Sequence, residues 1–168
     1  FIRQSNGHIG VDSAPGRGTT FTIHLPRTVE LPERTSSAQQ APMPRGEERV
    51  LVVEDEPGLR AVTVEQLRSL GYAVSEAADG VAGLAAFESA GEPYDLLLTD
   101  VAMPGMNGES LAAAIAARWP RTRIVFMSGY AEDTIVHNGI IDAGVLLLSK
   151  PFRKSELAQI VRQALDGP

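Results

Sequence analysis

Short apolar runs alternate with helix-like segments from Arg49 to the end of the chain. The runs are RVLVV (49–53), AVSEA (73–77), YDLLLT (94–99), RIVFM (123–127) and GVLLL (144–148). Each run has the length and composition of a buried strand. Strands that alternate with helices favour a parallel sheet with helices on both faces. The pattern therefore predicts a three-layer α/β domain over residues 49–168.

Three segments of this region carry apolar residues at helical spacing. The first, residues 57–71, has Pro57 near its start and Gly71 as its stop, which are typical helix boundaries. The other two are ESLAAAIAARWP (109–120) and KSELAQIVRQAL (154–165). The side chains predicted to face the core are Leu59, Val62, Leu67, Leu70, Leu111, Ile115, Trp119, Leu157, Ile160, Val161 and Leu165.

The front of the chain has a different pattern. Residues 1–26 predict two strands, GHIGVDS and TTFTIHLP, joined by the turn APGRG. Phe21, Ile23 and Leu25 alternate with polar residues, as expected of a half-buried strand. A segment this short rarely buries enough surface to fold alone, so we expect it to be the end of a larger domain. Residues 27–48 are rich in Pro, Ser, Gln and Glu without an apolar period, which predicts a flexible linker.

Composition and charge narrow the possible functions. The net charge is −6, and all of the excess lies after Glu48, where ten basic residues face sixteen acidic ones. This balance argues against nucleic-acid binding and favours a metal cation or a basic partner. No apolar run approaches the ~18 residues of a membrane span, so we expect no membrane contact. The absence of cysteine excludes thiolate metal sites and fits a reducing cytoplasm.

Polar side chains follow four of the five predicted strands, at the point where each strand ends. The strand at 73–77 ends at nothing comparable. In open α/β sheets, binding sites lie outside the carboxyl ends of the strands, so we expect these side chains to meet at one edge. They are Glu54, Asp55 and Glu56 after the first strand, Asp100 after the third, Ser128 after the fourth and Lys150 after the last.

Several carboxylates facing one lysine leave an uncompensated negative charge. Two like charges ~4 Å apart repel by about 4 kcal/mol at an effective dielectric near 20. A divalent cation relieves this repulsion, and oxygen ligands without His or Cys favour Mg²⁺. Mg²⁺ held by few carboxylates takes further ligands from water and phosphate, which indicates phosphoryl chemistry. Each residue alone is also typical of a cap or turn, and only their joint placement favours a site.

Four segments also carry a family resemblance. VLVVEDEP (50–57), LLLTDVAMPGMNG (96–108), VFMSGYA (125–131) and LLSKPF (147–152), in this order and spacing, resemble the receiver domain of two-component signalling. The resemblance covers residues 49–168. It implies a flavodoxin-like (βα)5 three-layer sandwich, whose parallel five-stranded sheet has the strand order 2-1-3-4-5.

The resemblance implies a role for each acidic residue. Asp100 is the nucleophile that accepts a phosphoryl group from a phosphohistidine. Asp55 binds Mg²⁺ directly, Glu54 acts from the same acidic pair through water, and the backbone carbonyl of Ala102 completes the protein ligands. A carboxylate is a weak nucleophile, so its reaction depends on correct orientation and on neutralisation of the charge on the phosphoryl oxygens.

The resemblance also implies roles for the residues around the acidic cluster. Lys150 pairs with phosphoryl charge, and Ser128 donates a hydrogen bond to a phosphoryl oxygen and moves when that oxygen arrives. Pro104 and Gly108 shape a loop whose backbone approaches the ion. The Lys150–Pro151 peptide bond is expected to be cis.

This sequence departs from the family pattern at one position of the last strand. Receivers usually carry an aromatic residue three positions before the lysine, and it swings as the hydroxyl residue moves. Here the position is Leu147. Phosphoryl acceptance is still expected, but the aromatic movement is not. Two alternatives stay open for Tyr130. Its side chain replaces part of that movement, or it shields the phosphoryl group.

The front segment GHIGVDSAPGRGTTFTIHLP resembles the last glycine box and final strands of a histidine-kinase ATP-binding domain. This implies a hybrid histidine kinase as the parent, with residues 1–26 as the C-terminal remnant of that domain. The Asn- and Asp-bearing ATP motifs of the family are absent, so we expect neither ATP binding nor autophosphorylation from this chain. His8, His24 and His137 lack a phosphohistidine-helix context and are expected to be surface or strand-face residues.

Three functions are consistent with these features. The leading hypothesis is a cytoplasmic phosphoryl-accepting receiver that takes phosphate from its own histidine-kinase domain and passes it to a histidine phosphotransfer protein. The alternative is a non-phosphorylated interaction module that uses the receiver fold to regulate the kinase, which Leu147 favours. The third is a flavin or nucleotide binder, which needs a Gly- or Ser/Thr-rich phosphate loop after the first strand. The sequence there is EDEPG, whose three acidic residues would repel a phosphate group, so this function is disfavoured.

Overall fold

The computed structural model describes residues 2, 7–27, 43–129 and 146–167. Tyr130 and His137 lie outside these ranges, and so do their predicted roles. The chain divides into two units, Phe1–Ala41 and Pro42–Pro168. Each unit is described by itself below.

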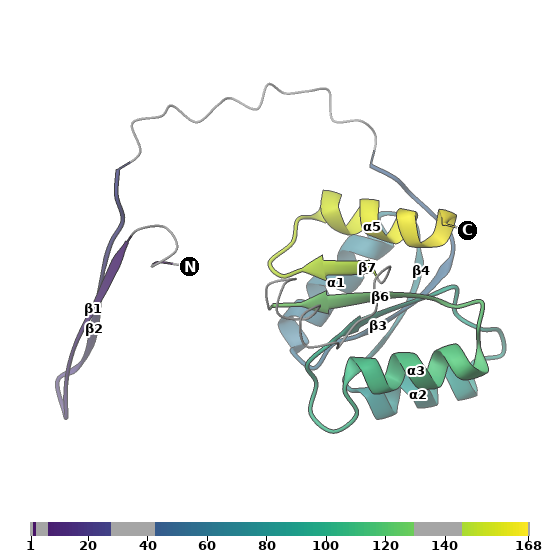
Figure 1. The fold of residues 1–168 in the computed structure, drawn as a ribbon, viewed down its shortest axis with the longest axis horizontal. Coiled ribbons are helices and arrows are strands. Elements are labelled where there is room, and N and C mark those ends of the chain that lie inside the picture. The colour runs from purple at the N-terminus through teal and green to yellow at the C-terminus, as the bar shows by residue number, and fades with distance from the viewer. Residues whose placement is uncertain (1, 3–6, 28–42, 130–145, 168) are drawn as a thin grey trace. The chain divides into compact units, whose positions relative to one another are not determined.

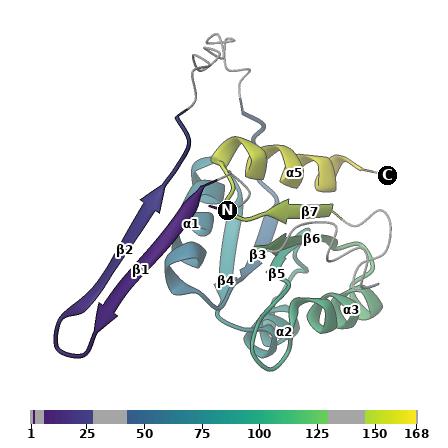
Figure 2. The ribbon, with the colours of Figure 1, turned by 60° about the vertical axis from the view of Figure 1, so that its left-hand side comes forward.

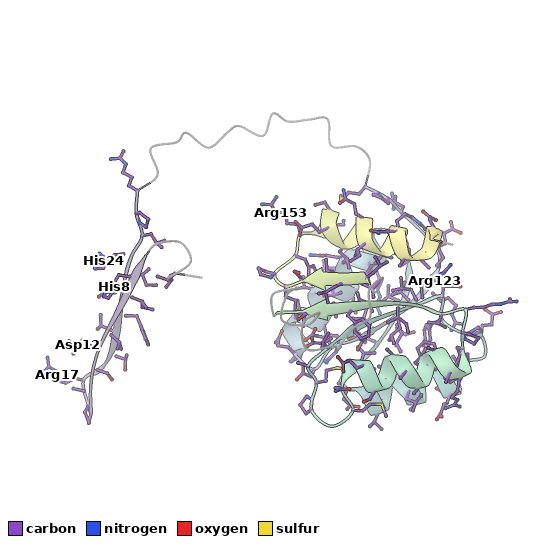
Figure 3. The ribbon with its side chains drawn as sticks, in the orientation of Figure 1. His8, Asp12, Arg17, His24, Arg123 and Arg153 are labelled. Carbon is purple, nitrogen blue, oxygen red and sulfur yellow. The ribbon has the colours of Figure 1, made fainter. Side chains whose placement is uncertain are left out.

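The first unit contains an antiparallel hairpin, formed by β1 (His8–Ala14) and β2 (Gly18–His24). Its two strands and turn confirm the predicted elements, and Ile9 faces Ile23 in the register. The predicted burial of one face is wrong, because Phe21, Ile23 and Leu25 are 66%, 53% and 55% exposed. A two-stranded ribbon has no second layer against which to pack its apolar side. Figure 3 shows its side chains, with His8, Asp12, Arg17 and His24 labelled.

The second unit is built on a five-stranded parallel sheet. Its strands are β3 (Arg49–Val53), β4 (Ala73–Ala77), β5 (Leu96–Asp100), β6 (Arg123–Ser128) and β7 (Leu146–Ser149). They lie in the order β4-β3-β5-β6-β7, with every neighbouring pair parallel. This is the order 2-1-3-4-5 expected for a flavodoxin-like fold. All five predicted strands are therefore confirmed.

Four described helices cover the two faces of this sheet. They are α1 (Pro57–Ser69), α2 (Gly80–Ser89), α3 (Gly108–Arg118) and α5 (Lys154–Asp166). Figures 1 and 2 show α1 and α5 on one face and α2 and α3 on the other. None of the helices in the described ranges is long and apolar enough to span a membrane.

Alternate residues of each strand enter the two apolar layers of the core. On β5, Leu96 and Leu98 pack in the layer beneath α1 and α5, whereas Leu97 packs in the layer beneath α2 and α3. All three are fully buried, as expected for a central parallel strand with helices on both sides. The core therefore fixes the strand ends, and with them the positions of the side chains that follow.

One residue of the predicted helical core is placed wrongly. Val62 is 49% exposed, and Thr63, Val64 and Leu67 form the buried side of α1 instead. Successive helical residues are rotated by about 100°, so Val62 lies some 200° from Val64 and points outward. The other apolar positions predicted to face the core are buried or partly buried.

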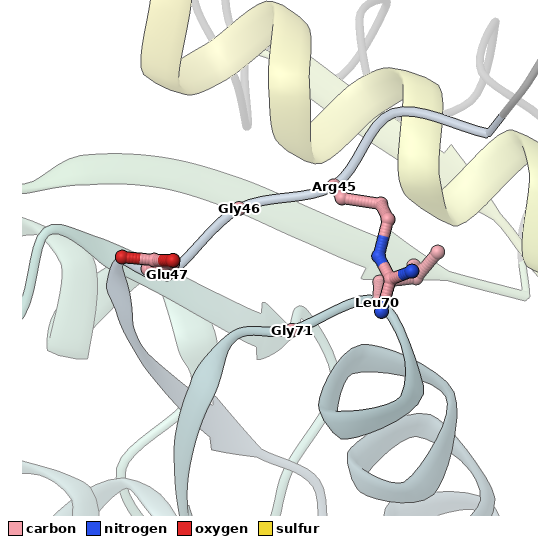
Figure 4. Close-up of a pocket in the computed structure, with 5 residues that line it drawn as sticks. All are labelled: Arg45, Gly46, Glu47, Leu70 and Gly71. Carbon is pink, nitrogen blue, oxygen red and sulfur yellow. The ribbon is translucent and has the colours of Figure 1, made fainter.

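A hollow lies where β3 begins, at the opposite end of that strand from Glu54. It has a volume of about 370 Å³ and is lined by Arg45, Gly46, Glu47, Leu70 and Gly71 (Figure 4). The Gly46 amide donates to the Leu70 carbonyl across 3.2 Å. Gly71 has a φ of +103°, and a Cβ there would meet the Gly46 carbonyl oxygen at 2.5 Å. Glycine at this position thus permits the segment before β3 to lie against the end of α1.

Candidate functional site

The predicted site residues follow three neighbouring strands of the sheet and a fourth at its edge. Glu54 follows β3, Asp100 ends β5, Ser128 ends β6, and Lys150 comes directly after β7. Because these strands are parallel, their carboxyl ends reach the same edge of the sheet. The fold thereby gathers residues that are up to 96 positions apart in the sequence.

Lys150 forms ion pairs with two carboxylates at once. Its Nζ lies 2.6 Å from Glu54 Oε2 and 3.0 Å from Asp100 Oδ2. The side chains are 15%, 1% and 11% exposed, for the lysine, the glutamate and the aspartate respectively. Because these groups are shielded from water, the electrostatic interactions between them are stronger than they would be on an open surface.

Asp55 joins the same cluster. Carboxylate oxygens of Glu54, Asp55 and Asp100 all lie within 4.8 Å of one another. Three negative charges against the single ammonium of Lys150 leave two uncompensated charges, which is the charge of one divalent cation. Grouped carboxylate oxygens without His or Cys suit Mg²⁺ or another hard cation. The residues present therefore fit the predicted metal site.

Burial dominates the ionisation of Glu54. Its removal from water raises the pKa of the Glu54 carboxyl, and the nearby charge of Asp100 acts in the same direction. The hydrogen bond and charge of Lys150 oppose this rise. The Glu54 carboxylate is thus held at the site by its lysine partner, against a cost of desolvation.

Glu56 has a different role from its two acidic neighbours. It is the N-cap of α1, and its side chain accepts hydrogen bonds from the backbone amides of Gly58 and Leu59. These donors lower the pKa of the Glu56 carboxyl. The third acidic residue of the motif therefore starts the helix, and its capping fixes the loop that carries Glu54 and Asp55.

The loop after Asp100 is held closely against the strand that it leaves. The Gly108 amide donates to the Val101 carbonyl across 3.1 Å, and the Val101 amide donates to the Met127 carbonyl across 3.0 Å. A Cβ on Gly108 would overlap the backbone carbonyl of Asp100. The Ala102 amide lies 3.4 Å from Asp100 Oδ1. Pro104 is exposed in the same loop.

Ser128 and Lys150 are connected through their backbones. Ser128 is 1% exposed, and its carbonyl accepts from the Lys150 amide across 2.7 Å. The peptide bond between Lys150 and Pro151 is cis. Leu147 is partly buried on β7 and lies in register with Phe126 of β6. An aliphatic side chain thus occupies the position at which the family resemblance implies an aromatic one.

Arg60 and Glu76 belong to this region, although their sequence context did not single them out. Arg60 lies on α1, and its Nη1 donates to the Glu54 carbonyl across 2.6 Å. Its Nε lies 3.3 Å from Glu76 Oε2 on β4. An arginine six residues after the first acidic residue, in the first turns of a predicted helix, is the only signal in the sequence for such a contact.

Residues 50–162 match the family model described as the response regulator receiver domain. This match covers more than half of the chain and includes each site residue named above. It also includes four strands of the parallel sheet in full and β3 from Val50 onward.

Several known proteins resemble this chain. The "Sensor kinase CckA" of Brucella abortus (strain 2308) is 38% identical, over 98% of this chain and 18% of that protein. The chain thus spans less than a fifth of this curated relative. Among solved structures, the "receiver domain from Hybrid Histidine Kinase CckA" is 39% identical, covering 70% of this chain and 99% of that one, with a TM-score of 0.58.

Another solved structure carries a metal ion. It is the receiver domain of the "sensor histidine kinase PA1611" from Pseudomonas aeruginosa PAO1, described "with magnesium ion coordinated in the active site cleft". It is 30% identical and covers 71% of this chain and 98% of that one, with a TM-score of 0.63.

Proposed function

This chain belongs to the response regulator receiver domain family, and we propose that Asp100 is its phosphoryl acceptor. The observation that carries the proposal is the arrangement of charge around Asp100. Its carboxylate is nearly buried at the end of β5, 3.0 Å from the Lys150 ammonium and beside Glu54 and Asp55. Three charged side chains of the predicted site thus lie around one candidate nucleophile.

In the proposed reaction, an Asp100 carboxylate oxygen attacks the phosphorus atom of a phosphohistidine. A P–O bond forms as the P–N bond breaks, and the electron pair of that bond returns to the imidazole. The product is an acyl phosphate on Asp100. The enzyme-like contribution of this chain is orientation and electrostatic stabilisation, since the donor already carries an activated phosphoryl group.

Two side chains act on the phosphoryl oxygens in this proposal. The Lys150 ammonium moves from its carboxylate partners toward the negative oxygens, and the Ser128 hydroxyl donates a hydrogen bond to one of them. Both residues come from strand ends on the same side of Asp100 in the sheet, because β6 and β7 follow β5 in the strand order.

Glu54, Asp55 and Asp100 are the side chains that would hold Mg²⁺, together with the backbone carbonyl of Ala102. The ion would supply charge neutralisation on the transferring oxygens. Support comes from the clustering of the three carboxylates in this chain and from the magnesium described for the PA1611 receiver.

The parent and the partners form part of the proposal. The alignment with the sensor kinase CckA extends over 98% of this chain, so it also includes the hairpin that precedes the receiver. This supports a hybrid histidine kinase in which residues 1–26 end the ATP-binding domain, 27–48 are a linker and 49–168 are the receiver. The donor would be the chain's own cytoplasmic kinase domain, and the recipient a histidine phosphotransfer protein.

The first test is the intact mass of the protein after incubation with acetyl phosphate or phosphoramidate, with and without Mg²⁺. We expect the gain of one phosphoryl group in the presence of Mg²⁺. Asp100→Asn is the matched variant, because asparagine keeps the shape of the side chain and loses the nucleophile. Phosphorylation that persists in Asp100→Asn would contradict the assignment of Asp100.

A second candidate function is favoured by Leu147. A receiver without the aromatic side chain at this position could serve as an unphosphorylated docking module that regulates the kinase. In that case, the wild-type protein gains no mass from either phosphodonor, even under conditions where calorimetry shows Mg²⁺ binding.

A further inference from the structure

Arg60 is positioned by two contacts on different strands. Its Nη1 donates to the backbone carbonyl of Glu54, directly after β3, across 2.6 Å. Its Nε lies 3.3 Å from Glu76 Oε2, on the neighbouring strand β4. The arginine side chain is only 18% exposed, whereas that of Glu76 is 44% exposed. The guanidinium is thus held in a fixed orientation, with its anchor at the surface.

The partners of this arginine are unexpected for its location. Arg60 donates to the peptide group between Glu54 and Asp55, both of which carry carboxylates, and arginine pairs readily with such groups. The contacts of Arg60 are nevertheless made with the carbonyl of Glu54 and with Glu76, while the Glu54 carboxylate is paired with Lys150. Glu76 therefore gives the guanidinium a partner that is outside the acidic cluster.

We propose that Arg60 is a positioning residue for the Mg²⁺ site and that Glu76 is its anchor. The proposal rests on the proposed function, because it assumes that the acidic cluster binds Mg²⁺. It goes further by assigning roles to two residues outside the cluster, one of them on β4, the strand that ends without a site residue of its own.

The backbone explains how Arg60 acts on the ligands. The Glu54 carbonyl belongs to the peptide group that joins Glu54 to Asp55, and this group is planar. A hydrogen bond to its oxygen therefore fixes the orientation of the whole peptide group, which includes the backbone nitrogen and Cα of Asp55. The Glu54 amide is fixed from the other side, since it donates to the Ala77 carbonyl across 3.3 Å. Asp55 itself is exposed, so its orientation depends on this backbone.

Positioning and simple electrostatics predict opposite effects of neutralising Arg60. Removal of a positive charge close to a cation site strengthens cation binding if charge alone matters. Removal of a hydrogen bond that orients the ligands weakens it, and loss of such supporting partners typically costs 10- to 100-fold in metal affinity. The sign of the change in Mg²⁺ affinity thus separates the two explanations.

The experiment is a calorimetric titration of Mg²⁺ into the full chain and its variants. We expect Arg60→Gln to weaken binding by about tenfold. Arg60→Lys keeps the charge but cannot reach both partners with one planar group, so it also weakens binding. Glu76→Gln weakens binding in the wild-type background and has little effect in Arg60→Gln, since Glu76 acts through Arg60.

Arg68→Gln is the matched control. Arg68 also lies on α1 and donates to a backbone carbonyl of β4, that of Val74, across 3.1 Å. Its contact is at the other end of the helix from the acidic cluster. We expect Arg68→Gln to lower the free energy of unfolding, as measured with urea, without changing the Mg²⁺ affinity. A merely structural role for Arg60 predicts the same behaviour for both arginine variants.

Two results distinguish the failure of this inference from the failure of the proposed function. If the wild-type protein binds no Mg²⁺, the proposed function is wrong and the inference falls with it. If the wild-type protein binds Mg²⁺ and Arg60→Gln binds it equally or more tightly, the inference alone is overturned. Should Arg60→Gln not fold, unchanged Mg²⁺ affinity in Arg60→Lys is the overturning result.

Discussion

At the scale of single residues, Lys150 reduces the electrostatic repulsion within the acidic cluster. It is the ammonium group that lies between the buried carboxylates of Glu54 and Asp100. Removal of one partner from a buried ion pair usually costs more than the pair contributes, because the other charge is left uncompensated. Here two carboxylates would be left to repel each other as well as to lose their partner.

Replacement of Lys150 by methionine therefore has a predictable effect on stability. Without divalent cations, we expect the free energy of unfolding to fall by about 3 kcal/mol. Added Mg²⁺ should recover part of this loss, since a ligand that binds only the folded state stabilises it. Urea unfolding of both proteins, in EDTA and in Mg²⁺, measures the two differences. Equal losses in the two conditions would show that Lys150 and the cation do not share these carboxylates.

Sequence reasoning was effective for residues whose position follows from the strand ends. Glu54, Asp55, Asp100 and Lys150 each follow an apolar run, and parallel strands bring such residues together. Arg60 and Glu76 could not be found in this way. Their contact depends on how α1 crosses the sheet, and no short motif of the sequence encodes that crossing.

At the scale of secondary-structure elements, the segment before β3 is attached to α5 and to the end of α1. Arg162 of α5 lies 2.7 Å from Glu48 and 2.9 Å from Asp166. Its Nη1 also reaches the Arg45 carbonyl across 3.5 Å. The hydrogen bond from Arg162 lowers the pKa of the Glu48 carboxyl. The contacts of the second unit thus begin before β3, within the last residues of the segment 27–48 that was predicted to be a linker.

This attachment predicts a pH dependence. Because the folded-state pKa of Glu48 is lowered, the Glu48–Arg162 pair contributes stability above the ordinary carboxyl pKa of about 4.3 and loses it as pH falls through the folded-state pKa. We expect Glu48→Gln to be less stable than wild type by about 1 kcal/mol at pH 7. The difference should vanish in acid, as measured by urea unfolding across this pH range.

The neighbouring exposed carboxylate provides the control for this prediction. Glu47 has no ion-pair contact among those described, so Glu47→Gln should unfold like the wild-type protein at every pH. A stability difference for Glu48→Gln that stays constant down to strongly acidic pH would indicate lost packing and not a lost charge interaction.

The elements were predicted well where the apolar pattern was strong. All five strands were recognised from their apolar runs, and α1, α3 and α5 from helical spacing. The helix α2, GVAGLAAFES, was not singled out, since its small residues occur on all sides and give no apolar stripe. Phe87 identifies its buried side, through an edge contact with Tyr94 and a tilted ring contact with Trp119, at centroid distances of 4.9 and 5.1 Å.

At the scale of the whole molecule, the second unit has its own core. Two apolar layers lie on either side of the sheet, and their members all come from residues after Arg49. We therefore expect residues 42–168 to fold without the first unit. The melting temperature, measured by circular dichroism, and the Mg²⁺ affinity should match those of the full chain. A lower melting temperature for 42–168 would indicate that the hairpin contributes to the stability of the receiver.

The hairpin has a consequence for the behaviour of the protein in solution. Its side chains Ile9, Val11, Phe21, Ile23 and Leu25 are between 43% and 66% exposed, and both of its strands are edges. Exposed apolar faces and free edges promote association between copies. Concentrated samples of the full chain should therefore scatter more light than equally concentrated samples of residues 42–168. For crystallisation or spectroscopy, the shorter chain is the better-behaved material.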